Sequence, residues 1–100
     1  MTIRLDRTGL VAGHRNPEAA ASAAEISTYL TEKLDMPTTW GVEVGGPVGT
    51  LHWYIDFADM AELEAGLAKS MTDPGYIEVI AKAADLFIEG RTKDSIIFMM

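Results

Sequence analysis

Apolar and polar side chains alternate in three segments of the chain, namely TIRLDR (2–7), TTWGVEV (38–44) and LHWYIDF (51–57). A period of two residues is typical of a strand that buries one face. In the third segment the odd positions are apolar or aromatic, whereas the even positions carry His52, Tyr54 and Asp56. A fourth segment near the C-terminus, DSIIFMM (94–100), also predicts a strand.

The second and third segments predict a β-hairpin. The sequence GGPVG between them is a turn signal. A four-residue loop, Gly45 to Val48, would place Trp40 opposite Trp53. A slip of one residue would place Trp40 opposite His52 and mix the two faces, which one-sided burial forbids.

An apolar period near 3.6 residues predicts a helix after the first strand. Asn16 is expected to be its N-cap, with Pro17 at the first helical position and Glu18 near the positive end. The helix should end before Pro37, because the residue that precedes a proline is driven out of helical geometry. Its apolar stripe consists of Ala19, Ala23, Ile26, Leu30 and Leu34.

Two further helices are expected after the hairpin. The sequence DMAE is a capping box, in which Asp59 caps the helix and Glu62 reaches back. Asp73 and Pro74 begin the next helix, and Gly90 is its expected left-handed stop. The predicted stripe of the first of these helices is Met60, Leu63, Leu67 and Met71, and the inner face of the second is Tyr76, Ile80, Ala83 and Phe87.

The predicted order βαββα(α)β is that of an α+β, ferredoxin-like domain spanning residues 1–100. Such a domain has a four-stranded antiparallel sheet with the helices on one face. The first and third strands are then central. A bare sheet face that carries aromatic and apolar groups is usually covered, so we expect a sheet-to-sheet homodimer that forms an α+β barrel. The residues predicted on that face are Arg4, Asp6, Glu43, His52, Tyr54, Ile97 and Met99.

Composition narrows the class of protein. The chain has 100 residues, of which 48% are hydrophobic and 23% charged, and its net charge is -7. The negative charge disfavours nucleic acid and anionic membranes as partners. The absence of cysteine excludes disulfides and thiolate chemistry. The N-terminus has no apolar signal-peptide region and the C-terminal apolar segment is too short to span a bilayer, so a cytoplasmic location is predicted.

The order of elements over nearly the whole chain resembles the dimeric α+β barrel superfamily. Within it, the chain is most similar to the small proteins related to antibiotic biosynthesis monooxygenases and to NIPSNAP proteins. The most specific local match is DFADMAELEAGLAKSMTDPGYIEVIAKAADLFIEGRTKDSIIF (56–98). This segment resembles the C-terminal half of these proteins in four features. They are a strand ending in Asp-Phe, an acidic capped helix, an Asp-Pro break followed by an aromatic residue, and an Asp before the last strand.

The resemblance implies a homodimer that closes a barrel through its sheets and holds a small ligand between each sheet and its helices. Activities in the superfamily include cofactor-free oxidation of aromatic polyketides, cyclisation, lactone isomerisation and haem chemistry, and some members have no known activity. The histidine-containing motifs of the haem-binding branches are missing: His52 is on a predicted strand and His14 in a loop. We therefore expect neither haem nor any other cofactor.

His52 and Tyr54 are the candidate catalytic residues. With Asp56 they share one face of a central strand, and Arg4 and Asp6 could lie across from them on the neighbouring strand. A histidine, a tyrosine and a carboxylate in an enclosed space can transfer protons. The alternative is a hydrogen-bonded dimer interface inside the barrel. If the ligand lies in a cleft between the sheet and the helices, a catalytic role would also require these side chains to reach that cleft from the opposite face of the sheet.

Trp40 and Trp53 are the candidate substrate-binding residues on the helix-facing side, with Tyr29 and Tyr76 as possible lids. Aromatic walls suit a flat, conjugated ligand, although large aromatics also dominate ordinary cores. Two functions follow as alternatives. One is a homodimer that binds or transforms a small hydrophobic, aromatic molecule, with cofactor-independent monooxygenation among the candidate reactions. The other is a non-catalytic dimeric binding or scaffolding module.

No metal site is predicted, because capping accounts for Asp59 and Glu62 near Asp56 and no calcium-binding loop is present. GGPVG joins two strands and opens no helix, so it is not a phosphate loop.

Overall fold

The computed structural model describes residues 1–45 and 49–100, and in this part of the chain all predicted helices and strands are present. In chain order they are β1 (Thr2–Leu10), α1 (Asn16–Lys33), β2 (Thr38–Val42), β3 (Thr50–Phe57), α2 (Met60–Thr72), α3 (Pro74–Ala83), the 3-10 turn η1 (Ala84–Leu86) and β4 (Lys93–Met99). The strands form one antiparallel sheet in the order β2-β3-β1-β4. The predicted ferredoxin-like α+β fold, with β1 and β3 central, is confirmed.

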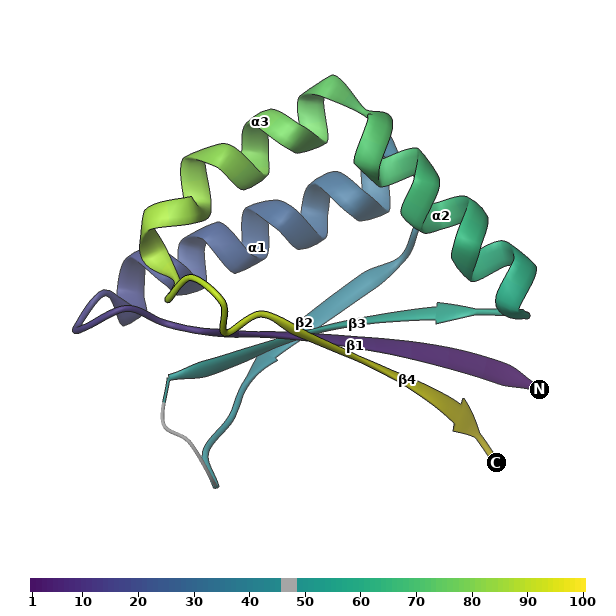
Figure 1. Cartoon of the computed structure of the whole chain (residues 1–100), viewed down its shortest axis with the longest axis horizontal. Helices are drawn as coiled ribbons and strands as arrows, with labels where there is room; N and C mark the ends of the chain where they lie inside the picture. Colours follow the sequence, from purple (N-terminus) through teal and green to yellow (C-terminus); the bar gives the residue numbers. More distant parts are fainter. Residues whose placement is uncertain (46–48) are drawn as a thin grey trace.

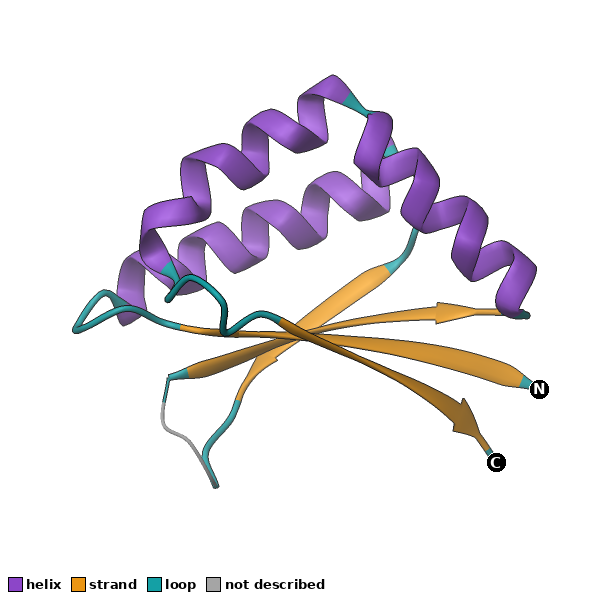
Figure 2. Cartoon of the chain, in the orientation of Figure 1, coloured by secondary structure: helices purple, strands orange, loops and turns teal. Residues whose placement is uncertain are grey.

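All three α-helices lie on one face of the sheet and leave the other face bare (Figure 1, Figure 2). The core between the two layers is apolar because the inward positions of the central strands meet the stripe predicted for α1. Leu5 and Leu63 are its largest fully buried side chains. The other buried apolar residues are Ile3, Val11, Ala19, Ala23, Ile26, Leu30, Leu34, Met36, Leu51, Trp53, Ile55, Phe57, Tyr76, Ala83 and Leu86.

The register of the predicted hairpin is confirmed. Trp40 lies opposite Trp53, and Val42 lies opposite Leu51. The backbone N–H of Glu43 also donates to the carbonyl of Thr50 (2.9 Å) and extends the pairing by one residue. Residues 46–48 of the predicted Gly45–Val48 loop lie outside the described residues.

Helix α1 begins one residue earlier than predicted. Asn16 is the first helical residue instead of the N-cap, and Arg15 occupies the cap position without a capping side chain. Arg15 forms an ion pair with Glu18 (2.8 Å), so the charge of Glu18 near the positive helix end is held by a side-chain partner. The helix ends at Lys33, ahead of Pro37 as predicted, and every residue of its predicted stripe is buried.

The predicted stripe of α2 is partly wrong. Asp59 caps the helix as expected, accepting from the Glu62 N–H (2.8 Å). However, Met60 and Met71 are 39% and 75% exposed, and the residues that face the core are Leu63, Gly66 and Ser70. Compared with the prediction, α2 is rotated about its axis, because its small residues allow it to lie close to the residues beneath it. A β-carbon at Gly66 would lie 2.7 Å from Met36 Sδ.

Helix α3 is capped by Asp73 as predicted, with the Tyr76 N–H as donor (2.8 Å), but it ends early. It was expected to continue to a stop at Gly90, whereas the α-helix ends at Ala83 and η1 ends at Leu86. Phe87 is extended and forms a bridge with Val11. Backbone hydrogen bonds with the end of β1 therefore replace the last turns of the helix, and Gly90 takes its positive φ (79°) in a later turn.

Candidate functional site

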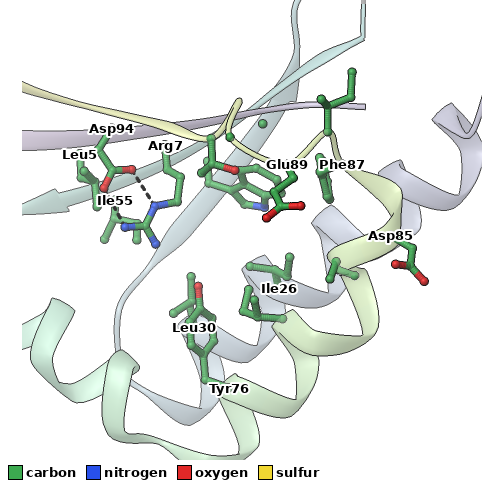
Figure 3. Close-up of a pocket in the computed structure, with 18 residues that line it drawn as sticks. Leu5, Arg7, Ile26, Leu30, Ile55, Tyr76, Asp85, Phe87, Glu89 and Asp94 are labelled. Atoms are coloured by element: carbon green, nitrogen blue, oxygen red, sulfur yellow. Dashed lines mark hydrogen bonds and ion pairs between the residues drawn. The ribbon is translucent and has the colours of Figure 1, made fainter. Parts of the chain in front are cut away.

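A cleft of ≈ 740 Å³ lies between the sheet and the helix layer (Figure 3). Its walls come from β1, β3, β4, α1, α3 and the segment that joins α3 to β4. The side chains that line it are mostly aliphatic or aromatic, with a few charged groups. The apolar ones include Leu5, Ile26, Leu30, Trp53, Ile55, Tyr76, Ile80, Ala83, Phe87 and Ile88, and the charged ones are Arg7, Asp85, Glu89 and Asp94.

Arg7 and Asp94 form an ion pair in one wall of the cleft (Figure 3). Arg7 is on β1 and lies opposite Asp94 on β4. Its Nε donates to Asp94 Oδ1 (2.7 Å) and its Nη2 to Oδ2 (2.8 Å), which is a two-point contact of guanidinium with carboxylate. These hydrogen bonds lower the pKa of Asp94 and raise that of Arg7. Both groups are therefore charged at neutral pH.

Sequence reasoning did not identify this pair. A signal was present, because Arg7 has the same strand parity as Ile3 and Leu5 and must therefore point toward the helices. Its partner is 87 residues away and becomes adjacent only through the β1–β4 pairing.

Trp53 and Tyr76, two of the predicted ligand-binding residues, line the cleft. The Trp53 ring packs against Phe87 at 5.7 Å between centroids and 60° between planes. Gly9 permits this contact, since a β-carbon there would lie 3.0 Å from the Phe87 ring. Burial raises the pKa of the Tyr76 hydroxyl, while the nearby Arg7 guanidinium opposes the shift. Tyr76 is therefore a neutral hydrogen-bonding group in the cleft.

Trp40 and Tyr29, the other two predicted ligand-binding residues, do not line the cleft. Trp40 is half-buried and packs against the edge of the core. The Tyr29 hydroxyl donates to Asp73 Oδ2 (2.5 Å), a hydrogen bond that raises the pKa of Tyr29 and lowers that of Asp73. The Tyr29 ring lies 6.2 Å from that of Tyr76, so Tyr29 packs beside a residue of the cleft without lining the cleft itself.

His52 lies on the opposite, bare face of the sheet, between two carboxylates. Its Nδ1 is 2.9 Å from Asp6 Oδ1 and its Nε2 is 2.7 Å from Glu43 Oε1. Burial alone lowers the pKa of His52, but the hydrogen bonds to Glu43 and Asp6 outweigh it and the pKa is raised. The protonated ring can donate to both carboxylates at once, which the neutral ring cannot.

Tyr54 stacks on the His52 ring, at 5.7 Å between centroids and 13° between planes. The Arg4 guanidinium lies 5.6 Å from the centre of the Tyr54 ring and donates two hydrogen bonds to Asp56 (2.8 and 3.1 Å). Burial, followed by the charge of Asp6, raises the pKa of Tyr54. The bare face therefore carries a connected polar network of the predicted residues.

The sheet separates the two groups of candidate residues. His52 lines a second hollow of ≈ 670 Å³ on the bare face, with Asp6, Glu43 and Lys93. Neither His52 nor Tyr54 lines the cleft beneath the helices. A proton transfer by His52 would therefore act on a molecule held at the bare face, and the catalytic role of these residues stays a prediction.

Side chains considered for a metal are engaged elsewhere. Asp56 is paired with Arg4, and Asp59 and Glu62 accept from backbone N–H groups at the start of α2. Residues 1–45 and 49–100 contain no group of three or more histidine, aspartate or glutamate side chains arranged to hold a metal ion. The same residues include no helix that is both long and apolar enough to cross a membrane.

No family model and no curated protein sequence matches the chain. Solved structures do match it. A NIPSNAP family protein from Agrobacterium tumefaciens has a TM-score of 0.83 and 14% identity, covering 100% of this chain and 94% of that one. A NIPSNAP-like domain protein from Burkholderia xenovorans has a TM-score of 0.83 and 15% identity, covering 99% and 85%.

SnoaB, a cofactor-independent oxygenase from Streptomyces nogalater, is also similar, with a TM-score of 0.69 and 12% identity over 98% of this chain and 92% of SnoaB. At these identities the likeness concerns the fold. The predicted resemblance is confirmed at that level: the chain has the ferredoxin-like α+β fold that NIPSNAP proteins share with SnoaB.

Proposed function

We propose that this chain binds a small, hydrophobic and aromatic molecule in the cleft beneath its helices, as a homodimer. The cleft itself is the observation that carries the proposal. Its volume of ≈ 740 Å³ is within the range of small-molecule sites, and such sites combine apolar walls with a few polar groups. Here Trp53, Tyr76 and Phe87 contribute aromatic rings to the walls, and Arg7 and Asp94 are the fixed polar groups. The proposed cytoplasmic location rests on the sequence alone.

Whether the ligand is also transformed is a separate part of the proposal. The similar fold of SnoaB, a cofactor-independent oxygenase, supports a test for oxygenation. The position of His52 and Tyr54 on the far side of the sheet favours the second candidate, a binding module without catalysis. Oxygen uptake in the presence of a bound phenol would support the enzyme, and its loss in His52→Gln would assign the reaction to the bare face of the sheet. Binding without oxygen uptake would support the module.

Blocking the cleft is expected to weaken ligand binding. Ala84 is exposed and lines the cleft, so an indole ring in Ala84→Trp would occupy it. We expect binding of one- to four-ring phenols, measured by equilibrium dialysis, to weaken by at least about tenfold, which corresponds to about 1.4 kcal/mol. Ala68→Trp, at an exposed position of α2 outside the cleft, is the matched control and should bind as the wild type does. Equal binding by both variants would contradict the proposal.

The homodimer is supported by apolar residues left exposed along β4. Ile97 and Met99 are on the bare face at 41% and 36% exposure, and Ile96 and Phe98 are exposed on the other side of the same edge strand. Ile97 and Met99 are thus neighbours on the bare face, and exposed apolar side chains grouped on one face are typical of interaction sites. The Arg4–Asp56 pair beside Ile97 offers both charges to a second copy of the same face.

A charge placed on the bare face is expected to break the dimer. In Ile97→Asp the new carboxylate would be buried against the partner, so we expect the dimer dissociation constant to rise by at least about tenfold. The measurement is sedimentation at micromolar concentration. Ile77→Asp is the control, because Ile77 is an equally apolar, 52% exposed residue on the helix layer. A monomeric wild type at this concentration would count against the proposed dimer.

A further inference from the structure

We infer that the cleft selects aromatic ligands with a positively charged head group, and that it disfavours aromatic acids. This inference rests on the proposed function, since it specifies the ligand of the same cleft. It is carried by the charges around the cleft. Three carboxylates border the cleft, those of Asp94, Glu89 and, at its exposed outer edge, Asp85, together with a single cationic side chain, that of Arg7.

The positive charge of Arg7 is already matched by the Asp94 carboxylate. Its guanidinium is already bound at two points by Asp94, with both hydrogen bonds shorter than 3 Å. A ligand carboxylate would have to displace that of Asp94 or lie beside it. Either arrangement brings two negative charges together in a half-buried wall, which is unfavourable.

Asp85 and Glu89 have no such partner. Within residues 1–45 and 49–100, no cation forms an ion pair with either side chain. Arg15 lies close to Asp85: it donates to the Asp85 backbone carbonyl (3.4 Å), and the Asp85 charge, after the hydrogen bond to and charge of Glu18, contributes to the raised pKa of Arg15. Its ion pair, however, is with the Glu18 carboxylate.

The basic side chains just before and at the start of β4 do not compensate these charges in the cleft. Arg91 and Lys93 line the hollow on the bare face instead. Negative groups thus exceed positive ones around the cleft, and the net charge of -7 extends the same sign over the molecule.

The aromatic wall adds to this preference. Figure 3 shows Phe87 and Glu89 together at one end of the cleft and the Arg7–Asp94 pair at the other. The faces of Trp53, Phe87 and Tyr76 carry negative π-density, and a cation over such a ring is attracted to it. An ammonium group of the ligand would therefore be attracted by the carboxylates and also by the aromatic rings. The aromatic body of the ligand would stack in the remainder of the cleft.

Three ligands of matched size test the inference: naphthylmethylamine, naphthylmethanol and naphthoic acid, which are cationic, neutral and anionic at pH 7. We expect equilibrium dialysis to show the amine binding about three- to tenfold more tightly than the alcohol, and the acid more weakly by a similar factor. The ratios should shrink at 1 M salt, because exposed charges are screened.

Glu89→Gln should reduce the preference for the amine over the acid, whereas Glu64→Gln, at an exposed position of α2 outside the cleft, should leave it unchanged. Equal or tighter binding of the acid would overturn the charge preference and leave the proposed cleft intact. If none of the three ligands binds, the proposed function and this inference both fall.

Discussion

Trp53→Ala is expected to lower the free energy of unfolding by about 3–5 kcal/mol and to abolish binding of aromatic ligands. The Trp53 side chain is 7% exposed, packs on Phe87 and forms part of the cleft. Its removal takes a large apolar area out of the core and, at the same time, removes the main stacking surface for the ligand. Urea unfolding followed by circular dichroism measures the first effect, and dialysis against the phenols measures the second.

Trp40→Ala is the matched control, because Trp40 is the direct cross-strand neighbour of Trp53. It is half-buried and outside the cleft, so the variant should be destabilised less and should bind ligands like the wild type. Equal loss of binding in both variants would mean that the cleft beneath the helices is not the ligand site.

The contribution of His52 to stability is expected to fall as the pH rises. The folded-state pKa of His52 is raised by the hydrogen bonds to Glu43 and Asp6, which outweigh the effect of burial. A raised pKa means that folding favours the protonated ring. The stabilisation is therefore complete below the unfolded pKa of about 6.5 and is lost as the pH passes through the folded pKa.

His52→Gln tests this expectation by urea unfolding at pH 6 and pH 9. At pH 6 we expect the variant to be about 1–3 kcal/mol less stable than the wild type, because two half-buried carboxylates lose a shared charged donor. The difference should be smaller at pH 9. His14→Gln, at an exposed loop position, is the control and should show no such trend. A difference that stays constant or grows with pH would contradict the assignment of a protonated His52.

The elements that sequence reasoning placed correctly are those controlled by local chemistry or by one-sided burial. The register of Trp40 with Trp53 follows from keeping apolar residues on one face, and Asp59 and Asp73 cap their helices because their side chains reach nearby N–H groups. The errors concern long-range packing. The rotation of α2 depends on how closely Gly66 approaches Met36, and this distance is not encoded in the pattern of α2 alone.

The same distinction applies to the candidate site. The chain pattern correctly separated the face of His52 from that of Trp53. It did not find the early end of α3, which brings Phe87 into the cleft, because the bridge of Phe87 with Val11 forms only in the folded molecule. Nor did it identify the Arg7–Asp94 pair, since the two residues meet only when the first and last strands of the fold are paired.

The pairing of β1 with β4 also sets an order of events during synthesis. β1 is a central strand, and one of its two neighbours is β4, the last strand of the fold. Met99 of β4 lies opposite Thr2 of β1. A nascent chain that ends before β4 can pair β1 with β3, but it leaves the other edge of β1 open and Arg7 without Asp94. Contacts between such distant segments form slowly, and an open strand edge is prone to aggregate. The sheet is therefore completed, and both edges of β1 are paired, only after β4 has left the ribosome.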